Sequence, residues 1–323
     1  MSIAFTHRRY IGKSSIEDGT EAHPFLIKDA FDFVAFKQAI EAGNTFDGIH
    51  HLLVNDIDLT GVTIPHGGSY YGIFNGGFRV LKNITINGGS NPIGLFYQIY
   101  DGTIKNLGIK NITLISTKGI GGLAMSCYGS IENCFITGNI SNTSGDRAGA
   151  IAAWVNSTDK TIKNCLTNVN IKIASNRAAG IAVFGGPNSS KIENCIALGN
   201  IDAGTQSYAG GITADKKNTD SVLNCVAAMS SIISTYTNGV ARVIHPTSQG
   251  GINNYALDSM LTNGSIPTAN IQANQANGAN ATESQLKSTA FYRDVLGWDM
   301  DTVWEVETEG VTFPRLRGFN YNF

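Results

Sequence analysis

The sequence predicts an all-β chain that folds as a single-stranded parallel β-helix, a solenoid of about seven coils. Three observations lead to this prediction. The phrase Ile-x-Asn-Cys recurs through the middle of the chain, and a second phrase of two small residues and one aliphatic residue keeps the same period. The apolar segments between the phrases are short and β-branched, which is typical of strands. The composition has 37 Gly, 7 Pro and 15% charged residues among 323, which suits stacked strands with small polar outer side chains.

The asparagine of the first phrase recurs with a nearly constant step. It falls at positions 106, 133, 164, 194, 224 and 254, so the steps are 27, 31, 30, 30 and 30 residues. A segment of about 30 residues is enough for one solenoid turn, and equivalent residues then lie about 4.8 Å apart. We therefore expect a structural ladder in which each side-chain amide bonds the next, formed by Asn106, Asn133, Asn164, Asn194 and Asn224.

The cysteines follow the same period. Four of the five lie directly after the repeated asparagines, at Cys134, Cys165, Cys195 and Cys225. A spacing of about 30 residues does not match a metal-binding cluster, and stacking in register points the Cβ vectors the same way, which is poor geometry for disulfides. We predict a buried column of thiols that act as small hydrophobic groups, with no metal site and no cofactor.

The remaining elements follow in chain order within one folded domain. Residues 1–28 are expected to form an N-terminal tail and entry strand, 29–43 a capping helix, 44–261 the parallel β-helix, 262–281 a loop, and 282–323 a C-terminal cap of a helix and a hairpin. Asp29 is the predicted N-cap of the first helix and Gly43 its stop. Thr282 and Gln285 form a capping box that predicts a second helix to about Val295. Both segments are interpreted as covers for the open ends of the solenoid.

Several motifs resemble one known family. They are residues 55–61 (NDIDLTG), 93–96 (IGLF), 102–107 (GTIKNL) and the tryptophan-rich ending over 297–316. Together with the repeated phrases they look like the GLUG-motif proteins, and the resemblance covers roughly residues 24–316. It implies a right-handed parallel β-helix of the kind found in bacterial surface proteins and phage proteins. The family's motifs are structural, so the resemblance supplies no catalytic residue.

A second column gives the candidate binding site. Three residues before the second small residue of each small-small-aliphatic phrase stand Arg147, Arg177, Tyr208 and Tyr236. Planar guanidinium donors beside aromatic rings suit a shallow strip for an acidic or neutral glycan. The alternative is that these residues close the corner of each coil, and strict alternation from the inward aliphatic would even point them inward.

No constellation of catalytic residues is visible. The coil carboxylates are sparse, and Glu132 and Glu193 alternate with Lys105 and Lys163 in the x position of the repeated phrase. Opposite charges on adjacent strands stabilise one register by about 0.2–1 kcal/mol, so this column predicts a structural role. The histidines do not occupy equivalent positions in the repeats. We therefore predict no catalytic residue, while a single sequence leaves open an active site assembled between chains.

Charge and hydropathy narrow the function classes. A net charge of −2 argues against an electrostatic nucleic-acid binder. No apolar run approaches the roughly 18 residues that a membrane span needs. Residues 1–10 contain two arginines but no apolar stretch after them, so we see no signal peptide.

The leading hypothesis is a non-enzymatic, adhesive virion protein of a bacteriophage, such as a tail-fibre, tailspike-like or decoration protein. Its expected partners are a bacterial surface glycan or receptor and other virion proteins, and a homotrimer is compatible with it. The first alternative is an adhesin or glycan-binding protein at the bacterial cell surface or secreted from the cell. The second alternative is a polysaccharide depolymerase, because parallel β-helices also carry such enzymes.

Overall fold

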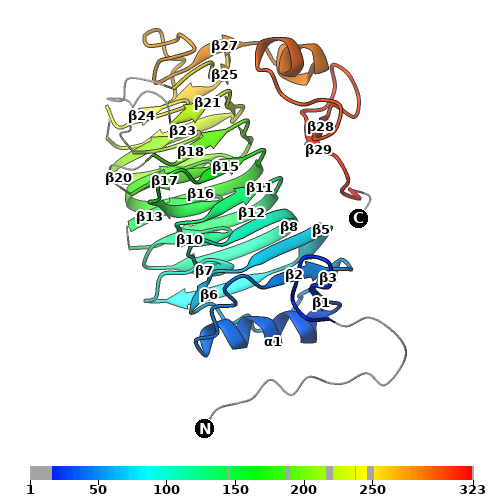
Figure 1. Ribbon diagram of the computed structural model, residues 1–323. Helices are drawn as coiled ribbons and strands as arrows, with labels where there is room; N and C mark the ends of the chain where they lie inside the picture. The colour runs from blue at the N-terminus through cyan, green and yellow to red at the C-terminus, as the bar shows by residue number, and fades with distance from the viewer. Residues whose placement is uncertain are drawn as a thin grey trace.

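Strands stacked one above another form a parallel β-solenoid of about eight turns (Figure 1). The computed structural model describes residues 17–144, 146–185, 189–215, 221–236, 238–245 and 251–321. The predicted fold class is thus confirmed. Residues 1–16 lie outside the described residues. They include most of the predicted tail and the segment in which we looked for a signal peptide.

Two sheets build the walls of the solenoid. The larger sheet has 22 strands and runs through every turn. Its strands are β1 (Phe25–Ile27), β2 (His50–Leu53), β3 (Ile57–Asp58), β5 (Ile73–Lys82), β6 (Thr85–Gly89), β8 (Thr103–Ser116), β9 (Ile120–Gly121), β11 (Ser130–Glu132), β12 (Phe135–Asn142), β13 (Asp146–Gly149), β15 (Thr161–Lys163), β16 (Leu166–Ala179), β18 (Lys191–Glu193), β19 (Ile196–Ala197), β20 (Ile201–Gly210), β21 (Val222–Leu223), β22 (Val226–Ala227), β23 (Ser231–Ser234), β24 (Val240–Ala241), β25 (Tyr255–Leu257), β26 (Leu261–Thr262) and β27 (Ala279–Ala281).

The second sheet has five strands, β4 (Ser69–Tyr70), β7 (Phe96–Ile99), β10 (Ala124–Cys127), β14 (Ala152–Val155) and β17 (Ala182–Phe184). A separate antiparallel pair near the C-terminus consists of β28 (Trp304–Glu305) and β29 (Arg315–Leu316).

The core consists of identical positions piled along the axis. Ile104, Ile131, Ile162, Ile192 and Val222 pair in register from one strand to the next, and all of them are buried. A short strand cannot bury a face alone, but the stacked column shares one continuous apolar interior. The repeated phrase therefore fixes the register of the whole stack.

The asparagine column forms a ladder of side-chain hydrogen bonds from Asn75 to Asn194. Each Nδ2 donates to the Oδ1 of the rung before it, from Asn106, which bonds Asn75, through Asn133, Asn164 and Asn194. Every rung of this run after Asn75 has φ between 51° and 54°. Asparagine tolerates this left-handed conformation better than other residues with a Cβ, and its amide can donate and accept at once. The sequence prediction missed Asn75 as the first rung.

The last rung of the ladder corrects the sequence prediction by one residue. Asn253, with φ 58°, donates to Asn224 Oδ1 at 3.0 Å. Asn254, which the period of 30 assigned to the ladder, occupies the cysteine position and is fully buried. Its Oδ1 accepts from the Cys225 backbone N–H at 2.8 Å, and its Nδ2 donates to the Val222 carbonyl at 2.9 Å. Counting positions failed here because the last coil is one residue shorter at this point.

The cysteine column is buried and contains free thiols. Cys134, Cys165, Cys195 and Cys225 each donate from Sγ to the carbonyl two residues earlier, at 3.1–3.3 Å. Burial raises the pKa of the Cys134 and Cys195 thiols well above the usual range. Thiols in this state are inert packing groups.

We expect Asn164→Gly to lower the free energy of unfolding by about 1–2 kcal/mol, because it removes two ladder hydrogen bonds and keeps the left-handed backbone. Asn164→Ala should lower the free energy of unfolding by about 1 kcal/mol more than Asn164→Gly, because a positive φ is unfavourable for alanine. Urea unfolding of both variants measures the two effects separately. Equal losses for glycine and alanine would show that the backbone conformation contributes nothing.

The N-terminal end of the solenoid is closed by helix α1 (Ala30–Glu41). Asp29 accepts a hydrogen bond from the Asp32 backbone N–H at 3.0 Å, and Gly43 follows the helix with φ 98°. Phe33, Phe36 and Ile40 are buried on the side that faces the first turns. In Figure 1 the helix lies across the end of the stack, as the sequence predicted.

At the C-terminal end of the solenoid, a buried arginine binds oxygen atoms of the last turns. Arg242 is 0% exposed and takes the place of Gly211 in the next turn, since the Gly211 N–H donates to its carbonyl. Its guanidinium donates to the carbonyls of Leu257, Asn277 and Gly278 and to Asn280 Oδ1. The segment 262–281, predicted to be only a loop, thus ends in β27, which pairs with β25 and extends the last turn.

The predicted hairpin of the C-terminal cap is present, two short helical turns stand in place of the predicted single helix, and the segment extends farther than an end cap. Residues 282–321, which we call the C-terminal strap, turn back and run along the outside of the solenoid (Figure 1), and the Tyr321 ring lies 5.4 Å from the Phe135 ring. The Trp298 Nε1–H donates to the Asn224 carbonyl at 2.8 Å. The Phe319 ring lies 4.9 Å from Phe135 and 5.4 Å from Phe78.

The strap packs on one outward column of the solenoid. This column takes the position after each repeated cysteine, and its members pair in register: Phe135, Leu166, Ile196 and Val226. They form a second apolar core with the strap residues Leu286, Phe291, Tyr292, Trp298, Trp304 and Leu316. The strap therefore joins turns that are far apart in the sequence.

The helix of the strap differs from the prediction. The capping box is formed, since the Thr282 N–H donates to Gln285 Oε1 and the Gln285 N–H donates to Thr282 Oγ1. However, only a 3₁₀ turn η1 (Gln285–Lys287) follows, and Ser288 is extended at φ −120° and ψ 127°. A π-helical turn η2 (Phe291–Val295) comes next. Ser288 thus divides what we predicted as one helix.

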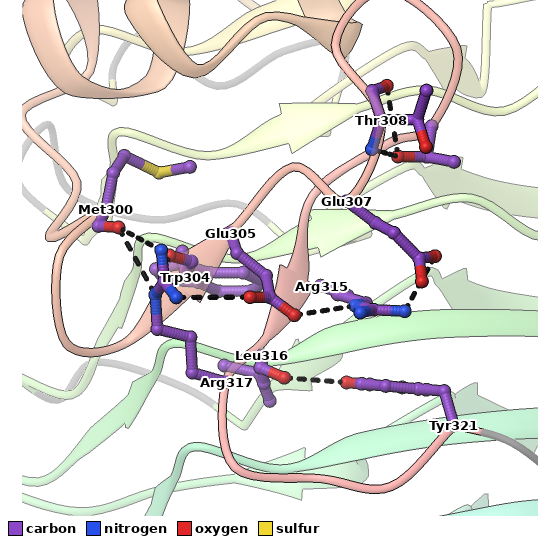
Figure 2. A network of polar contacts seen from close by, with 10 residues as sticks. Met300, Trp304, Glu305, Glu307, Thr308, Arg315, Leu316, Arg317 and Tyr321 are labelled. Atoms are coloured by element: carbon purple, nitrogen blue, oxygen red, sulfur yellow. Dashed lines mark hydrogen bonds and ion pairs between the residues drawn. The ribbon is translucent and has the colours of Figure 1, made fainter.

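A network of ion pairs holds the hairpin β28–β29 together (Figure 2). Glu305 accepts from Arg315 Nε at 2.8 Å and from Arg317 Nη1 at 3.1 Å. Arg317 also donates to the carbonyls of Met300 and Trp304, and Arg315 pairs with Glu307 at 2.7 Å. Single exposed ion pairs contribute little, so we assign this network to fixing the geometry of the strap.

Candidate functional site

The candidate column lies on three consecutive turns of the larger sheet. Arg147 of β13 pairs in register with Arg177 of β16, and Arg177 pairs with Tyr208 of β20. The residue after each of them is an alanine that is fully buried, so the column itself stays outside and is half-buried. The inward orientation that strict alternation allowed is therefore wrong, because the small-small phrase makes a corner and breaks the alternation there.

Tyr236 joins this group through its ring and not through strand register. The structure pairs Ala209 with Val240 and Gly210 with Ala241, so the small-small phrase of the next turn is Ala241-Arg242-Val243. The sequence had suggested that Gly239 is the equivalent of Gly211, which made Tyr236 the equivalent of Tyr208. In the structure Arg242 is the equivalent of Gly211, so the predicted alignment is wrong by three residues. The Tyr236 ring nevertheless contacts Tyr208, with centroids 5.3 Å apart at 86°.

Asp215 lies between the two arginines. Its Oδ1 is 3.3 Å from Arg177 Nε and its Oδ2 is 4.0 Å from Arg147 Nη1. Burial and the neighbouring Arg177 guanidinium lower the pKa of Arg147, and the carboxylates of Asp215 and Asp146 oppose this shift. The arginines thus share one anion supplied by the chain itself, a partner that sequence spacing did not reveal.

The aromatic side chains border the arginines. The Arg147 guanidinium lies over the Trp154 ring at 3.7 Å from its centroid, and Arg147 Nη1 donates to the Phe184 carbonyl at 3.4 Å. The Tyr208 ring also stacks on the buried His245, with centroids 4.3 Å apart. Tyr236 is 40% exposed, and the adjacent Tyr208 raises the pKa of its hydroxyl. The result is a fixed surface of alternating charge and aromatic area.

A second, partly exposed aromatic group was missed by the sequence prediction. Tyr71, Tyr100 and Tyr128 stack on successive turns, with centroids 5.1 and 5.2 Å apart, at the corner that follows the five-stranded sheet. The signal was available, since each of these tyrosines stands one or two residues before a glycine at steps of 29 and 28 residues. Neighbouring ring planes are tilted by 36° and 40° to each other, and of the three tyrosines only Tyr100 is exposed.

The other candidate groups lie where the strand register puts them. Lys105, Glu132, Lys163 and Glu193 are adjacent rungs of one column. Among the described residues, no group of three or more His, Cys, Asp or Glu side chains could hold a metal ion. Within the same ranges, no helix is both long and apolar enough to cross a membrane.

A hollow of about 450 Å³ lies between the last turns and the strap. Ala228, Leu257, Leu261, Phe313 and Glu283 are among its lining residues, and none of them belongs to the arginine–tyrosine column. The Glu283 carboxylate already pairs with Lys287 Nζ at 2.6 Å. We therefore place the candidate site at the column and not in this hollow.

These features define a parallel β-solenoid with closed ends, an external strap and one arginine–aromatic edge. No family model and no curated protein sequence matches the chain. Among solved structures it is similar to a putative immunoglobulin A1 protease from Bacteroides ovatus, with a TM-score of 0.70 and 24% identity over 93% of this chain and 94% of that one. A second similar structure is an IgA1 protease, with a TM-score of 0.54 and 16% identity over 83% of this chain. The chain spans 22% of the length of that second protein. Both likenesses concern the fold, and the GLUG resemblance stays a prediction.

Proposed function

We propose that the protein is a non-enzymatic, adhesive rod that binds glycan through the edge formed by Arg147, Arg177, Tyr208, Tyr236 and Trp154. The observation that carries this proposal is the column of planar donors and aromatic rings on consecutive turns, half-buried and held by Asp215. Guanidinium groups donate in pairs to sugar oxygens, and tyrosines offer apolar area with little loss of conformational entropy. A rigid solenoid keeps the spacing of these groups fixed, which favours an extended ligand.

The carrier of this rod is proposed to be a phage virion that contacts the bacterial surface. A second carrier, the bacterial cell surface itself, is favoured by the likeness to a Bacteroides ovatus protein over nearly its whole length. In the IgA1 protease the similar region is one part of a longer chain. Mass spectrometry of purified particles and of peptides released by protease from intact cells distinguishes the two carriers.

We expect Tyr208→Ala to weaken binding to glycan-bearing bacterial cells by about tenfold, since a central tyrosine of a binding surface contributes on the order of 1.4 kcal/mol. Binding of the labelled protein to cells, with and without periodate oxidation of the glycans, is the measurement. Tyr100→Ala is the matched control, because Tyr100 also stacks between aromatic neighbours but lies at another corner. Equal binding by both variants and the parent would mean that the ligand binds elsewhere on the protein. New reducing ends in glycans incubated with the protein would indicate a depolymerase.

A further inference from the structure

We propose that the arginine–aromatic edge selects uncharged, hydroxyl-rich glycans over acidic ones, and that Asp215 determines this selection. The inference rests on the proposed function, and it narrows the acidic or neutral glycan that the sequence allowed. It is carried by the position of Asp215 between Arg147 and Arg177, where a ligand anion would otherwise sit.

The charges that the described residues contribute to the cluster balance one another. Arg147 and Arg177 contribute two positive charges, and Asp215 and Asp146 contribute two negative charges. The Asp215 side chain is 17% exposed, and those of Arg147 and Arg177 are 20% and 27% exposed, so the pairing is partly shielded from water. Interactions between partly buried charges are screened little by salt. A ligand carboxylate would have to displace Asp215 or meet two like charges, and like-charge juxtaposition costs several kcal/mol.

An uncharged glycan meets none of these obstacles. Sugar hydroxyls can donate to a carboxylate oxygen of Asp215 and accept from the outward N–H groups of the guanidinium ions. Each of these hydrogen bonds has one charged partner, which makes it stronger than a neutral one. Tyr236, which is 40% exposed beside Tyr208, adds apolar area for the C–H faces of the sugar. The edge thus offers donors, an acceptor and an apolar face without a net charge.

The test uses the full chain on a glycan array that carries uncharged and uronic-acid glycans, followed by binding to polygalacturonate in solution. We expect the parent protein to bind uncharged glycans. Asp215→Asn should gain salt-sensitive binding to polygalacturonate by about tenfold, because it leaves the arginines with excess positive charge. Asp146→Asn is a second variant, in a half-buried residue that is not placed between the arginines, and should change binding in the same direction. Asp202→Asn is the matched control, since Asp202 pairs with Lys172 on an exposed face.

The outcomes separate the inference from the proposed function. Binding of the parent to acidic glycans, abolished by high salt, would overturn the selection of uncharged ligands and leave glycan binding intact. No gain of polygalacturonate binding in either variant, with melting temperatures near that of the parent, would overturn the role of Asp215. Binding of no glycan by any variant would overturn both proposals.

Discussion

Replacing Trp298 with alanine is expected to lower the free energy of unfolding by about 3–5 kcal/mol, because a buried indole is lost and a cavity remains. Trp298 is 2% exposed and stacks on Trp304 at 4.5 Å and on Tyr292 at 4.7 Å. Its Nε1–H also donates the hydrogen bond that joins the C-terminal strap to the Asn224 carbonyl. We therefore expect the strap to detach and to expose Phe135 and Leu166.

Hydrogen exchange followed by mass spectrometry measures this detachment directly. Peptides from residues 282–321 should lose protection while those from the middle turns keep it. The matched pair Trp298→Phe and Trp304→Phe isolates the hydrogen bond, because the buried Trp304 Nε1 has no partner in the described part of the chain. Trp298→Phe should cost about 1 kcal/mol more than Trp304→Phe. Full protection of the strap in Trp298→Ala would show that the other contacts alone dock it.

The solenoid could be predicted from sequence because its rungs demand particular residues. An amide that must donate, accept and tolerate a positive φ is best met by asparagine, so the ladder is visible as a column. The inward cysteine and isoleucine positions are set by the same register. Where the repeated phrase is less regular, the predicted alignment was wrong by one residue at Asn254 and by three residues at Tyr236. The turns there differ in length, so counting a constant period fails, and only the hydrogen bonds between strands define which residues are equivalent.

The path of the strap was not predicted, although one sign of it was present. Phe135, Leu166 and Ile196 each follow an inward cysteine, so alternation places them outside. A row of large apolar residues on an outer face indicates that another segment covers it. The covering segment is the strap, which begins at residue 282 and is thus 86 residues or more from each of these three side chains, and no local pattern joins the two.

The candidate site was predicted in part. Strand register brings Arg147, Arg177 and Tyr208 together, and the repeat made that visible. Asp215 belongs to no repeated phrase and reaches the arginines from the turn after β20. Sequence spacing alone could not show that Asp215 lies between the two arginines and offsets part of their charge.

We expect Lys37→Met to be more stable than the parent by on the order of 3 kcal/mol at pH 7, because a buried ammonium is costly and a methionine of similar length is not. Lys37 lies on the inner side of α1, is 0% exposed, and has its Nζ 4.8 Å from the centre of the Phe96 ring. Its Nζ has no hydrogen-bond partner among the described residues. Burial lowers the pKa of Lys37 to about 7, and Glu41 one turn later opposes this only weakly.

The sign of the pH dependence follows from these pKa values. Between pH 7 and about 10.4 the unfolded chain binds a proton at Lys37 that the folded chain does not, so the contribution of Lys37 to stability rises with pH. The advantage of Lys37→Met over the parent should therefore shrink by about 1.4 kcal/mol for each pH unit in this window. The difference between the two proteins is the proper measure, because the buried cysteines, with raised pKa values, lower the stability of both as the pH rises.

Urea unfolding at pH 7, 8 and 9 tests this expectation, and below pH 7 the advantage should be constant. His51, whose pKa burial lowers to about 3, lies under the same helix and titrates in a separate, more acidic window in both proteins. Lys28→Met is the control, since Lys28 pairs with Glu17 near the surface. A difference between Lys37→Met and the parent that does not change from pH 7 to 9 would mean that Lys37 keeps an ordinary pKa, and hence that helix α1 does not seal the end of the solenoid from water.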